Sequence, residues 1–171
     1  NELSNNPTGG MGFNKSLEPI SSLSYEYGWK GNFSNSSMEI IGYNILSSNE
    51  ILPFELEEYP GKNFYRNVGE TSRSGLELSW NYFFSSAALQ LSYTISDNKF
   101  KSYEINDSQL KGKKIPGIPN QLFDLSLLFN FQKELNLKID YQFVGKRFAD
   151  NLNLTEIESH SLLTFKISKP F

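Results

Sequence analysis

The 171-residue sequence contains no cysteine, only two methionines and a single histidine, His160. Without cysteine there is no disulfide framework and no thiolate metal site, and one imidazole without such partners is more typical of a surface residue than of a ligand. Long apolar runs are also missing, since no stretch approaches the ~20 residues that a spanning helix needs. We therefore expect no metal and no cofactor site, and any membrane contact must be made by strands.

Neither sign of charge dominates the chain, which carries a net charge of −3 with 20% charged residues. Binding along a nucleic-acid backbone needs clustered Lys and Arg, so nucleic acid is not an expected partner. His160 has no Asp and Ser at a recognisable spacing, and we expect no catalytic residues and no enzyme. No Gly-spaced calcium loop follows the acidic residues Glu55, Glu57 and Glu58, which favours a solvated loop face.

Aromatic residues are abundant, at 15%, although the mean hydropathy is only −0.44. Alternation explains this combination, and residues 75–84 show it most clearly. Their even positions hold Leu76, Leu78, Trp80, Tyr82 and Phe84, while Gly, Glu, Ser and Asn occupy the odd positions. Because successive side chains of a strand point to opposite faces, this spacing predicts a strand with one apolar and one polar face.

Six further stretches repeat the alternation, which gives about seven strands and no credible helix. They are residues 22–33, 38–46, 87–96, 121–131, 135–143 and 161–168. The second is the least regular: we expect Ile41, Tyr43 and Ile45 on the apolar face, although Met38 and Ile40 blur the pattern.

The predicted connections alternate in length. Those at 34–37, 85–86 and 132–134 are short, whereas those at 55–72, 97–120 and 144–160 are long. In an up-and-down barrel every second connection lies at the same end, and outer-membrane barrels have short turns at one end and long loops at the other. Aromatic residues near strand ends suit interfacial girdles. These are Trp80, Tyr82, Phe84, Phe129 and Phe131 near short turns, and Tyr141 and Phe143 near a long loop.

The pattern therefore predicts an all-β fold, an antiparallel up-and-down transmembrane β-barrel segment. Its lumen face would carry the charges Glu26, Glu77, Asp124, Asp140 and Lys138. Parity alone leaves open a soluble, non-enzymatic β-sandwich or barrel used for binding, in which the apolar face is an interior core.

Four segments carry short motifs whose order along the chain is informative. They are residues 1–31, 64–82, 110–121 and 141–153. Within them Leu17-Glu18-Pro19 precedes Tyr25-Glu26-Tyr27-Gly28, and Asn67-Val68-Gly69 precedes Gly75-Leu76-Glu77. In this order the chain resembles the C-terminal part of the β-barrel of TonB-dependent outer-membrane receptors, most closely those for ferric siderophores and other iron complexes.

The resemblance implies a barrel of about 22 strands with an N-terminal plug, in the outer membrane of a Gram-negative bacterium. It implies uptake of a ferric siderophore or similar iron complex, energised through TonB, with membrane lipid and lipopolysaccharide as further partners. No plug domain and no TonB box can be found in residues 1–171, and about seven strands cannot close a barrel. We therefore expect a fragment of the barrel, truncated at both ends. Outer-membrane barrels commonly end in an aromatic residue, so Phe171 leaves a true C-terminus open, but Lys169 and Pro170 interrupt the alternation expected there.

Ligand contacts are expected in the long loops, because barrels place specificity there. The candidates are Tyr59, Phe64, Tyr65, Arg66, Tyr103, Arg147 and Phe148. The cluster Lys111, Lys113 and Lys114 favours a solvated loop, with attraction of an anionic ferric complex or a lipopolysaccharide phosphate as the alternative.

Overall fold

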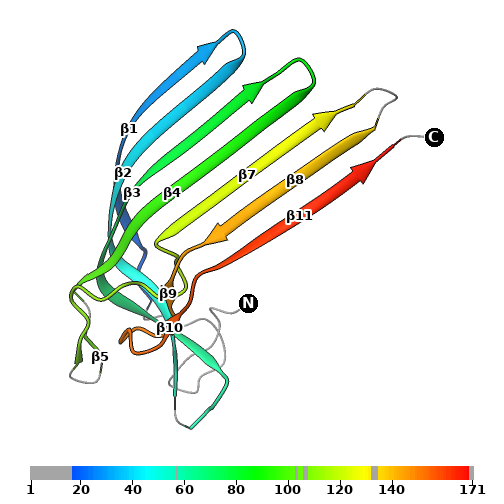
Figure 1. Ribbon diagram of the computed structural model, residues 1–171. Coiled ribbons are helices and arrows are strands. Elements are labelled where there is room, and N and C mark those ends of the chain that lie inside the picture. The colour runs from blue at the N-terminus through cyan, green and yellow to red at the C-terminus, as the bar shows by residue number, and fades with distance from the viewer. Residues whose placement is uncertain (1–16, 57, 103, 106–107, 132–134, 170–171) are drawn as a thin grey trace.

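The fold is one antiparallel sheet in which strands adjacent in sequence are adjacent in space, as the computed structural model shows (Figure 1). The structure describes residues 17–169, except 57, 103, 106–107 and 132–134. The sheet order is β1-β2-β3-β4-β7-β8-β11, which confirms the predicted up-and-down arrangement of seven strands. Their bounds are β1 (Ser21–Phe33), β2 (Ser36–Glu55), β3 (Asn63–Phe83), β4 (Ala87–Ser102), β7 (Gln121–Asn130), β8 (Asn136–Val144) and β11 (His160–Ser168).

Two pairs of two-residue strands lie in the long connections. They are β5 (Glu104–Ile105) with β6 (Ser108–Gln109), and β9 (Arg147–Phe148) with β10 (Glu156–Ile157). The tight turns that join β1 to β2 and β3 to β4 lie at one end of the sheet, and the connections after β2, β4 and β8 lie at the other (Figure 1). The predicted loop before residue 17, the turn at 132–134, and the residues Tyr103 and Phe171 lie outside the described residues.

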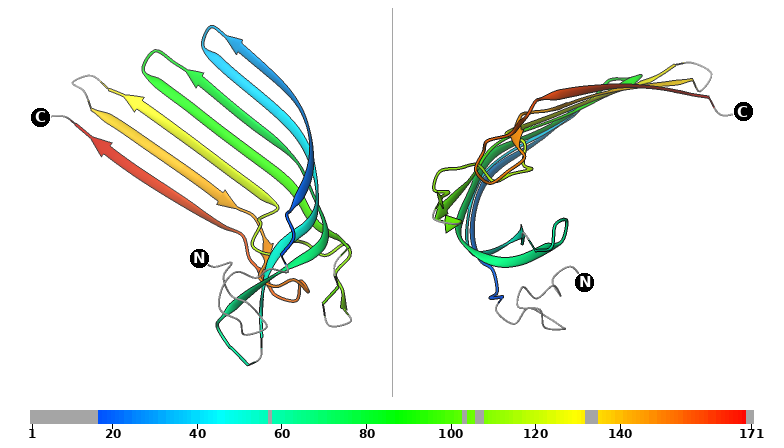
Figure 2. Two further views of the ribbon diagram at one scale, coloured as in Figure 1. Left: turned by 180° about the vertical axis from the view of Figure 1, so that it is seen from behind. Right: turned by 90° about the horizontal axis from the view of Figure 1, so that it is seen from below.

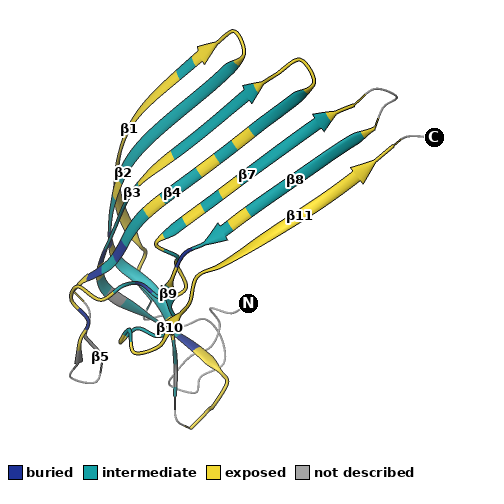
Figure 3. Cartoon of the chain, in the orientation of Figure 1, coloured by how far each residue is buried: buried dark blue, intermediate teal, exposed yellow. Residues whose placement is uncertain are grey.

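The sheet is open and curved. Seen from below it forms a crescent, and the β2–β3 hairpin bends over its concave side (Figure 2). The first and last strands of the sheet, β1 and β11, are exposed almost throughout, whereas the strands between them are half-buried (Figure 3). Two strands with unpaired edges are what a section of a larger wall presents.

The register assigns each side chain to a face, because directly opposite residues share a side. Trp80 on β3 lies opposite Met38 on β2 and Leu91 on β4, and Leu91 lies opposite Leu125 on β7. Extending these pairs across the sheet gives a continuous apolar face. Its members on β3, β4, β7 and β8 are Leu76, Leu78, Trp80, Tyr82, Leu89, Leu91, Tyr93, Ile95, Phe123, Leu125, Leu127, Phe129, Leu137, Ile139, Tyr141 and Phe143.

The opposite, concave face is polar, as predicted. It carries the five expected charges, Glu26, Glu77, Asp124, Asp140 and Lys138. A hollow of about 550 Å³ runs along this face between β3 and β11, lined chiefly by Ser, Asn, Gln, Asp and Thr. Within it the Gln142 amide donates to the Asp124 carboxylate at 2.9 Å. Asp140, which also lines the hollow, pairs with Lys138 on the same strand at 2.8 Å.

The prediction for residues 38–46 is wrong about the face. Met38 and Ile40 lie opposite Trp80 and Leu78 on the apolar side, so Ile41, Tyr43 and Ile45 lie on the polar side. The physical reason is that glycines leave gaps there, which apolar side chains cover. A Cβ at Gly75 would lie 2.7 Å from Cζ of Tyr43, and one at Gly28 would lie 3.4 Å from Cγ1 of Ile41.

The predicted long connection at 55–72 is also wrong over most of its length. Residues 63–72 belong to β3, and β2 extends to Glu55, so only residues 56–62 connect the two strands. The extension is a two-stranded ribbon in which Phe54 lies opposite Phe64 and Pro53 opposite Tyr65. Charges and Pro53 hid this alternation, together with Asn49, whose φ of 58° departs from the extended backbone although β2 continues through it.

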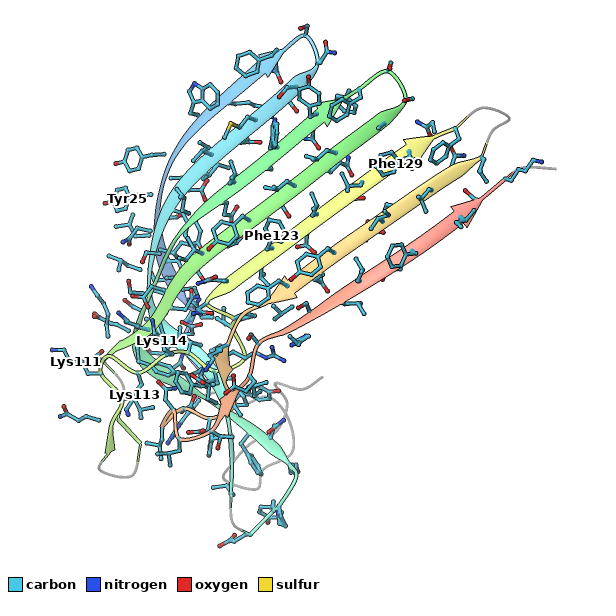
Figure 4. All side chains as sticks on the ribbon, in the orientation of Figure 1. Tyr25, Lys111, Lys113, Lys114, Phe123 and Phe129 are labelled. Atoms are coloured by element: carbon cyan, nitrogen blue, oxygen red, sulfur yellow. The ribbon has the colours of Figure 1, made fainter. Side chains whose placement is uncertain are left out.

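Aromatic side chains gather at both ends of the apolar face, as expected for interfacial girdles. Near the short turns, the ring centroids of Tyr82 and Phe84 lie 4.5 Å apart, and those of Phe129 and Phe131 lie 6.3 Å apart. Nearer the long connections, Phe123 contacts Tyr93 and Tyr141 at 6.4 and 6.0 Å. Figure 4 shows Phe123 and Phe129 at these two levels. Between the levels, residues 87–95 of β4 span roughly 26 Å along the strand at ~3.3 Å per residue.

Few apolar side chains are buried. Among the described residues they are only Phe64, Phe100, Leu110 and Ile115. Leu76, Leu163 and Phe165 on the apolar face are 46%, 52% and 62% exposed. A soluble sandwich would bury such a face in its interior, so this distribution favours a face that meets lipid. The described residues contain no helix long and apolar enough to cross a membrane.

The side chain of Asn67 ties the start of β1 to the β2–β3 ribbon. Its amide nitrogen donates to the carbonyls of Glu18 at 2.8 Å and Asn49 at 2.7 Å, and its amide oxygen accepts from the Glu18 N–H at 2.7 Å. The Asn49 amide also donates to the Glu18 carboxylate at 3.0 Å. Two motifs far apart in the sequence, at 17–19 and 67–69, are therefore in direct contact.

Replacing Asn67 with alanine should release this junction. The Asn67→Ala substitution removes three hydrogen bonds to the Glu18 and Asn49 backbone groups. Because water can reach these groups, the expected cost is about 0.5–1.5 kcal/mol. Amide hydrogen exchange in the intact protein should accelerate at the start of β1. Asn81→Ala is the matched control, because the Asn81 amide makes one bond of 3.3 Å to Ser37 on the same sheet. Equal acceleration in both variants would contradict the assigned role.

Candidate functional site

The tip of the β2–β3 ribbon carries a cluster of rings and cations. The Phe64 ring centroid lies 6.0 Å from that of Phe54 and 5.8 Å from that of Tyr59. The Lys62 ammonium lies 5.4 Å from the Phe64 centroid and 5.7 Å from that of Tyr59, and the Arg66 guanidinium lies 4.7 Å from the Phe54 centroid. These distances are within the range of cation–π attraction. We call these five residues the tip cluster.

The turn at the end of the ribbon sets this geometry. The N–H of Tyr59 donates to the Leu56 carbonyl at 2.9 Å, and the N–H of Lys62 donates to the Tyr59 carbonyl at 3.1 Å. Gly61 between them has a φ of 78°, which glycine adopts without strain. The turn thereby folds Tyr59 and Lys62 back over the strand residue Phe64.

Members of the tip cluster differ in what they offer a ligand. Phe64 is 2% exposed and therefore supports its neighbours, whereas Tyr59 is 49% exposed and Lys62 is also exposed. Arg66 is half-buried on β3, as is its neighbour Tyr65. The exposed surface of the cluster thus presents a phenol and an ammonium, with a guanidinium beside them.

A second group lies where the connections after β4 and β8 meet. The Gly117 N–H donates to the Phe148 carbonyl at 2.9 Å, and the Asn120 N–H donates to the Lys146 carbonyl at 3.2 Å. The Asn153 side chain makes two hydrogen bonds to the Lys114 backbone: its amide oxygen accepts from the Lys114 N–H at 2.6 Å, and its amide nitrogen donates to the Lys114 carbonyl at 2.9 Å. The two connections are therefore held as one unit.

Asp150 shapes the turn that positions Asn153. Its carboxylate accepts from the N–H groups of Leu154 at 3.1 Å and Thr155 at 2.7 Å. These backbone donors hold the pKa of Asp150 below its ordinary value. Asn153 itself has a φ of 57°, a conformation that asparagine tolerates better than most residues. The motif at 150–153 therefore stabilises the loop internally.

A small cavity of about 130 Å³ opens between these connections, and Arg147 and Phe148 line it. Lys146 also lines it, and its ammonium pairs with Glu156 at 2.8 Å and Glu158 at 3.2 Å. The bond to Glu156, followed by that to Glu158, raises the pKa of Lys146 above its ordinary value. Since two carboxylates compensate Lys146, Arg147 is the more available cation of the pair for an anionic ligand.

The structure thus divides the predicted ligand residues between two sites. Tyr59, Phe64 and Arg66 share the tip cluster, and Tyr65 adjoins it on β3. Arg147 and Phe148 line the cavity, and Tyr103 lies outside the described residues. Phe64, Tyr65 and Arg66 belong to a strand rather than to a loop.

Phe54 and Lys62 of the first site were not among the predicted ligand residues. A Pro-Gly-Lys turn between Tyr59 and Phe64 was the available signal for Lys62. The described residues contain no cluster of three or more His, Cys, Asp or Glu side chains that could hold a metal ion.

Solved structures with the same fold are large receptors and transporters. The chain matches the ferric yersiniabactin uptake receptor FyuA from Yersinia pestis with a TM-score of 0.69 and 16% identity over 86% of its length. It matches BauA, the ferric preacinetobactin receptor from Acinetobacter baumannii, with a TM-score of 0.70 and 16% identity over 88%. It matches the copper transporter OprC with a TM-score of 0.66 and 16% identity over 94% of its length.

The matched region is a minor part of each of these proteins, covering 22% of FyuA, 23% of BauA and 24% of OprC. At such identities the structures establish a shared fold. The sequence itself is more decisive, because the family model described as "TonB dependent receptor-like, beta-barrel" matches residues 1–171. The chain therefore belongs to the TonB-dependent receptor-like β-barrel family.

Proposed function

We propose that the chain is a section of the barrel wall of a receptor that imports a ferric siderophore or a similar iron complex. The observation that carries the proposal is the family match over residues 1–171, joined to a sheet with one lipid-facing and one polar face. Members of this family are receptors and transporters of the Gram-negative outer membrane, not enzymes. The sheet accordingly crosses that membrane, and the soluble binding domain is set aside.

The seven strands form part of a closed barrel whose remaining strands pair with the edges of β1 and β11. In this proposal the plug and the TonB box belong to the intact receptor outside these 171 residues, and TonB acts through them. The section described here holds the channel open and carries ligand-binding surfaces at its long-loop end.

The chemistry of the tip cluster favours an anionic ligand with aromatic character. Lys62 and Arg66 supply positive charge, and Tyr59 supplies an exposed ring with a hydroxyl. A ferric complex whose chelator carries negative charge and aromatic rings matches this surface, whereas Lys62 and Arg66 would repel a bare cation such as a copper ion, which supports iron complexes over copper as cargo. Tyr65, Arg147 and Phe148 are the further proposed contacts.

Iron uptake in a host that has TonB but lacks its own iron receptors tests the proposal. Cells producing the intact receptor should accumulate radioactive iron from iron-loaded spent medium of the source bacterium, and cells without TonB should not. Equal accumulation with and without the receptor would contradict the function.

In the same cells, the double substitution Tyr59→Ala/Lys62→Ala should raise the iron-complex concentration needed for half-maximal uptake by roughly tenfold. Each ring–cation contact contributes about 0.5–2 kcal/mol. Tyr27→Ala is the matched control, because Tyr27 is 77% exposed on β1 but lies on the lipid face. An unchanged half-maximal concentration in the double variant would remove the tip cluster from the ligand site.

A further inference from the structure

The side chains of β2 exchange faces of the sheet at Asn49. Before this residue, Ser47 lies opposite Thr71 on the polar, concave face. Strict alternation along the strand would then point Glu50 to the lipid-facing side. Instead, the Glu50 carboxylate contacts the side chains of Thr71 and Arg73, which both belong to the polar face of β3. Glu50 therefore faces the lumen.

Two further observations place this exchange at the base of the β2–β3 ribbon. The pairing of β2 with β3 skips Asn49 and its expected partner Gly69, and the φ of Asn49 is 58°. Beyond the skipped pair, Leu52 packs against the buried cluster that contains Phe100, a residue of the polar side of β4. The ribbon is therefore turned relative to the wall, so that the side with Glu50 and Leu52 faces the lumen.

Glu50, Arg73 and Thr71 form a closed group at this turn, which we call the ribbon triad. The Arg73 guanidinium pairs with one carboxylate oxygen of Glu50, and its other terminal nitrogen donates to the Thr71 hydroxyl at 3.1 Å. That hydroxyl donates to the second carboxylate oxygen of Glu50. The side chains of Glu50 and Arg73 are only 13% and 24% exposed, and Thr71 is 1% exposed.

An ion pair in such a sheltered site is better suited to fix geometry than to add stability. Desolvation of the two charges offsets much of their attraction, whereas loss of one partner leaves the other charge without compensation. The planar guanidinium also restricts the directions from which both of its contacts can form at once. The ribbon triad therefore favours one orientation of the ribbon on the wall.

This orientation matters because the tip cluster lies at the end of the ribbon. The β2–β3 hairpin bends over the concave side of the sheet (Figure 2). Phe54 of the tip cluster lies four residues beyond Glu50 on β2, opposite Phe64. We propose that Glu50 and Arg73 are a positioning pair, which holds the tip cluster over the lumen of the receptor. The inference rests on the proposed function, in which that cluster contacts the ligand.

Pulsed electron paramagnetic resonance on the intact receptor tests the positioning directly. Spin labels at Glu58→Cys and Lys111→Cys, two exposed positions, report the distance from the ribbon tip to the connection after β4. The labelled receptor should give one narrow distance distribution, and Glu50→Gln should broaden or displace it. Glu39→Gln is the matched control on the same strand. It breaks an ion pair with Lys30 whose side chains are more exposed, 38% and 64%, and should leave the distribution unchanged.

Two more variants separate positioning from folding. The charge swap Glu50→Arg/Arg73→Glu should restore the narrow distribution. Thr71→Val keeps both charges but removes the hydroxyl link, so it should broaden the distribution less than Glu50→Gln does, and it carries the test if Glu50→Gln does not fold. A native distribution in both Glu50→Gln and Thr71→Val, equal broadening in Glu39→Gln, or no restoration by the swap would overturn the proposal.

Iron uptake by the same variants adds a functional readout. If Glu50→Gln lowers the population of the productive orientation to roughly one tenth, the iron-complex concentration for half-maximal uptake should rise about tenfold with the maximal rate retained. A lower maximal rate alone would contradict a positioning role. Because the distance measurement needs no ligand, an altered distance in a receptor that imports no iron contradicts only the proposed function. An unchanged distance in a receptor that imports iron contradicts only the positioning pair.

Discussion

The Leu91→Arg substitution should destabilise the intact receptor in a lipid bilayer by about 2–4 kcal/mol. Leu91 lies midway along the outward positions of β4, between Trp80 and Leu125 on the neighbouring strands. An arginine there places its charge at the centre of the lipid-facing band, where no described side chain can pair with it. Urea-induced unfolding of the receptor in vesicles, followed by tryptophan fluorescence, measures the loss.

The adjacent residue provides the control for this experiment. Gln90 points to the polar face, between Asn81 and Ser126, and lines the 550 Å³ hollow. Gln90→Arg should therefore change the unfolding free energy by less than about 1 kcal/mol. In a strand with one face in lipid, arginine should cause a large loss of unfolding free energy at one position and a small loss at the adjacent position. Similar losses at both positions would show that the assignment of the faces is wrong.

Strand identity was predictable from sequence because alternation acts locally. Residues 75–84 and 87–96 alternate without interruption, and both were placed correctly with their faces. The face of residues 38–46 was not predictable, because both parities carry apolar residues and the choice depends on partners in other strands. Opposite Tyr43 the partner is Gly75, and opposite Met38 it is Trp80, so the register decides.

The kinds of residue in the candidate site were predictable from the sequence, but the contacts between them were not. Tyr59 and Arg66 were predicted as a ring and a charge in a long loop, yet their common contact with the Phe54–Phe64 pair depends on the ribbon. The ribbon was missed because Asn49 breaks the alternation, and the feature that stabilises this break is remote in sequence. It is the bond from Asn67 to the Asn49 carbonyl.

The Gly69→Ala substitution should be the most damaging small change in the ribbon. A Cβ at Gly69 would lie 1.9 Å from the backbone oxygen of Ser102 and 2.7 Å from its side-chain oxygen. The close approach arises where the β3–β4 register shifts between Glu70 and Thr71. A backbone atom cannot rotate away as a side chain can, so the end of β4 must separate from β3. We expect a loss of about 1–3 kcal/mol or more in the free energy of unfolding.

Gly42→Ala separates this clash from the general effect of replacing a strand glycine. The nearest atom to a Cβ at Gly42 is the Tyr27 carbonyl oxygen at 3.9 Å, an ordinary contact, so this variant should stay within about 0.5 kcal/mol of the native protein. Trypsin offers a local readout, because separation of β4 exposes the peptide bonds after Lys101 and Lys111. Faster cleavage there in Gly69→Ala but not in Gly42→Ala is expected. Unchanged cleavage in both would mean that Ser102 yields without releasing the strand, and that the glycine is not what holds the two strands at this distance.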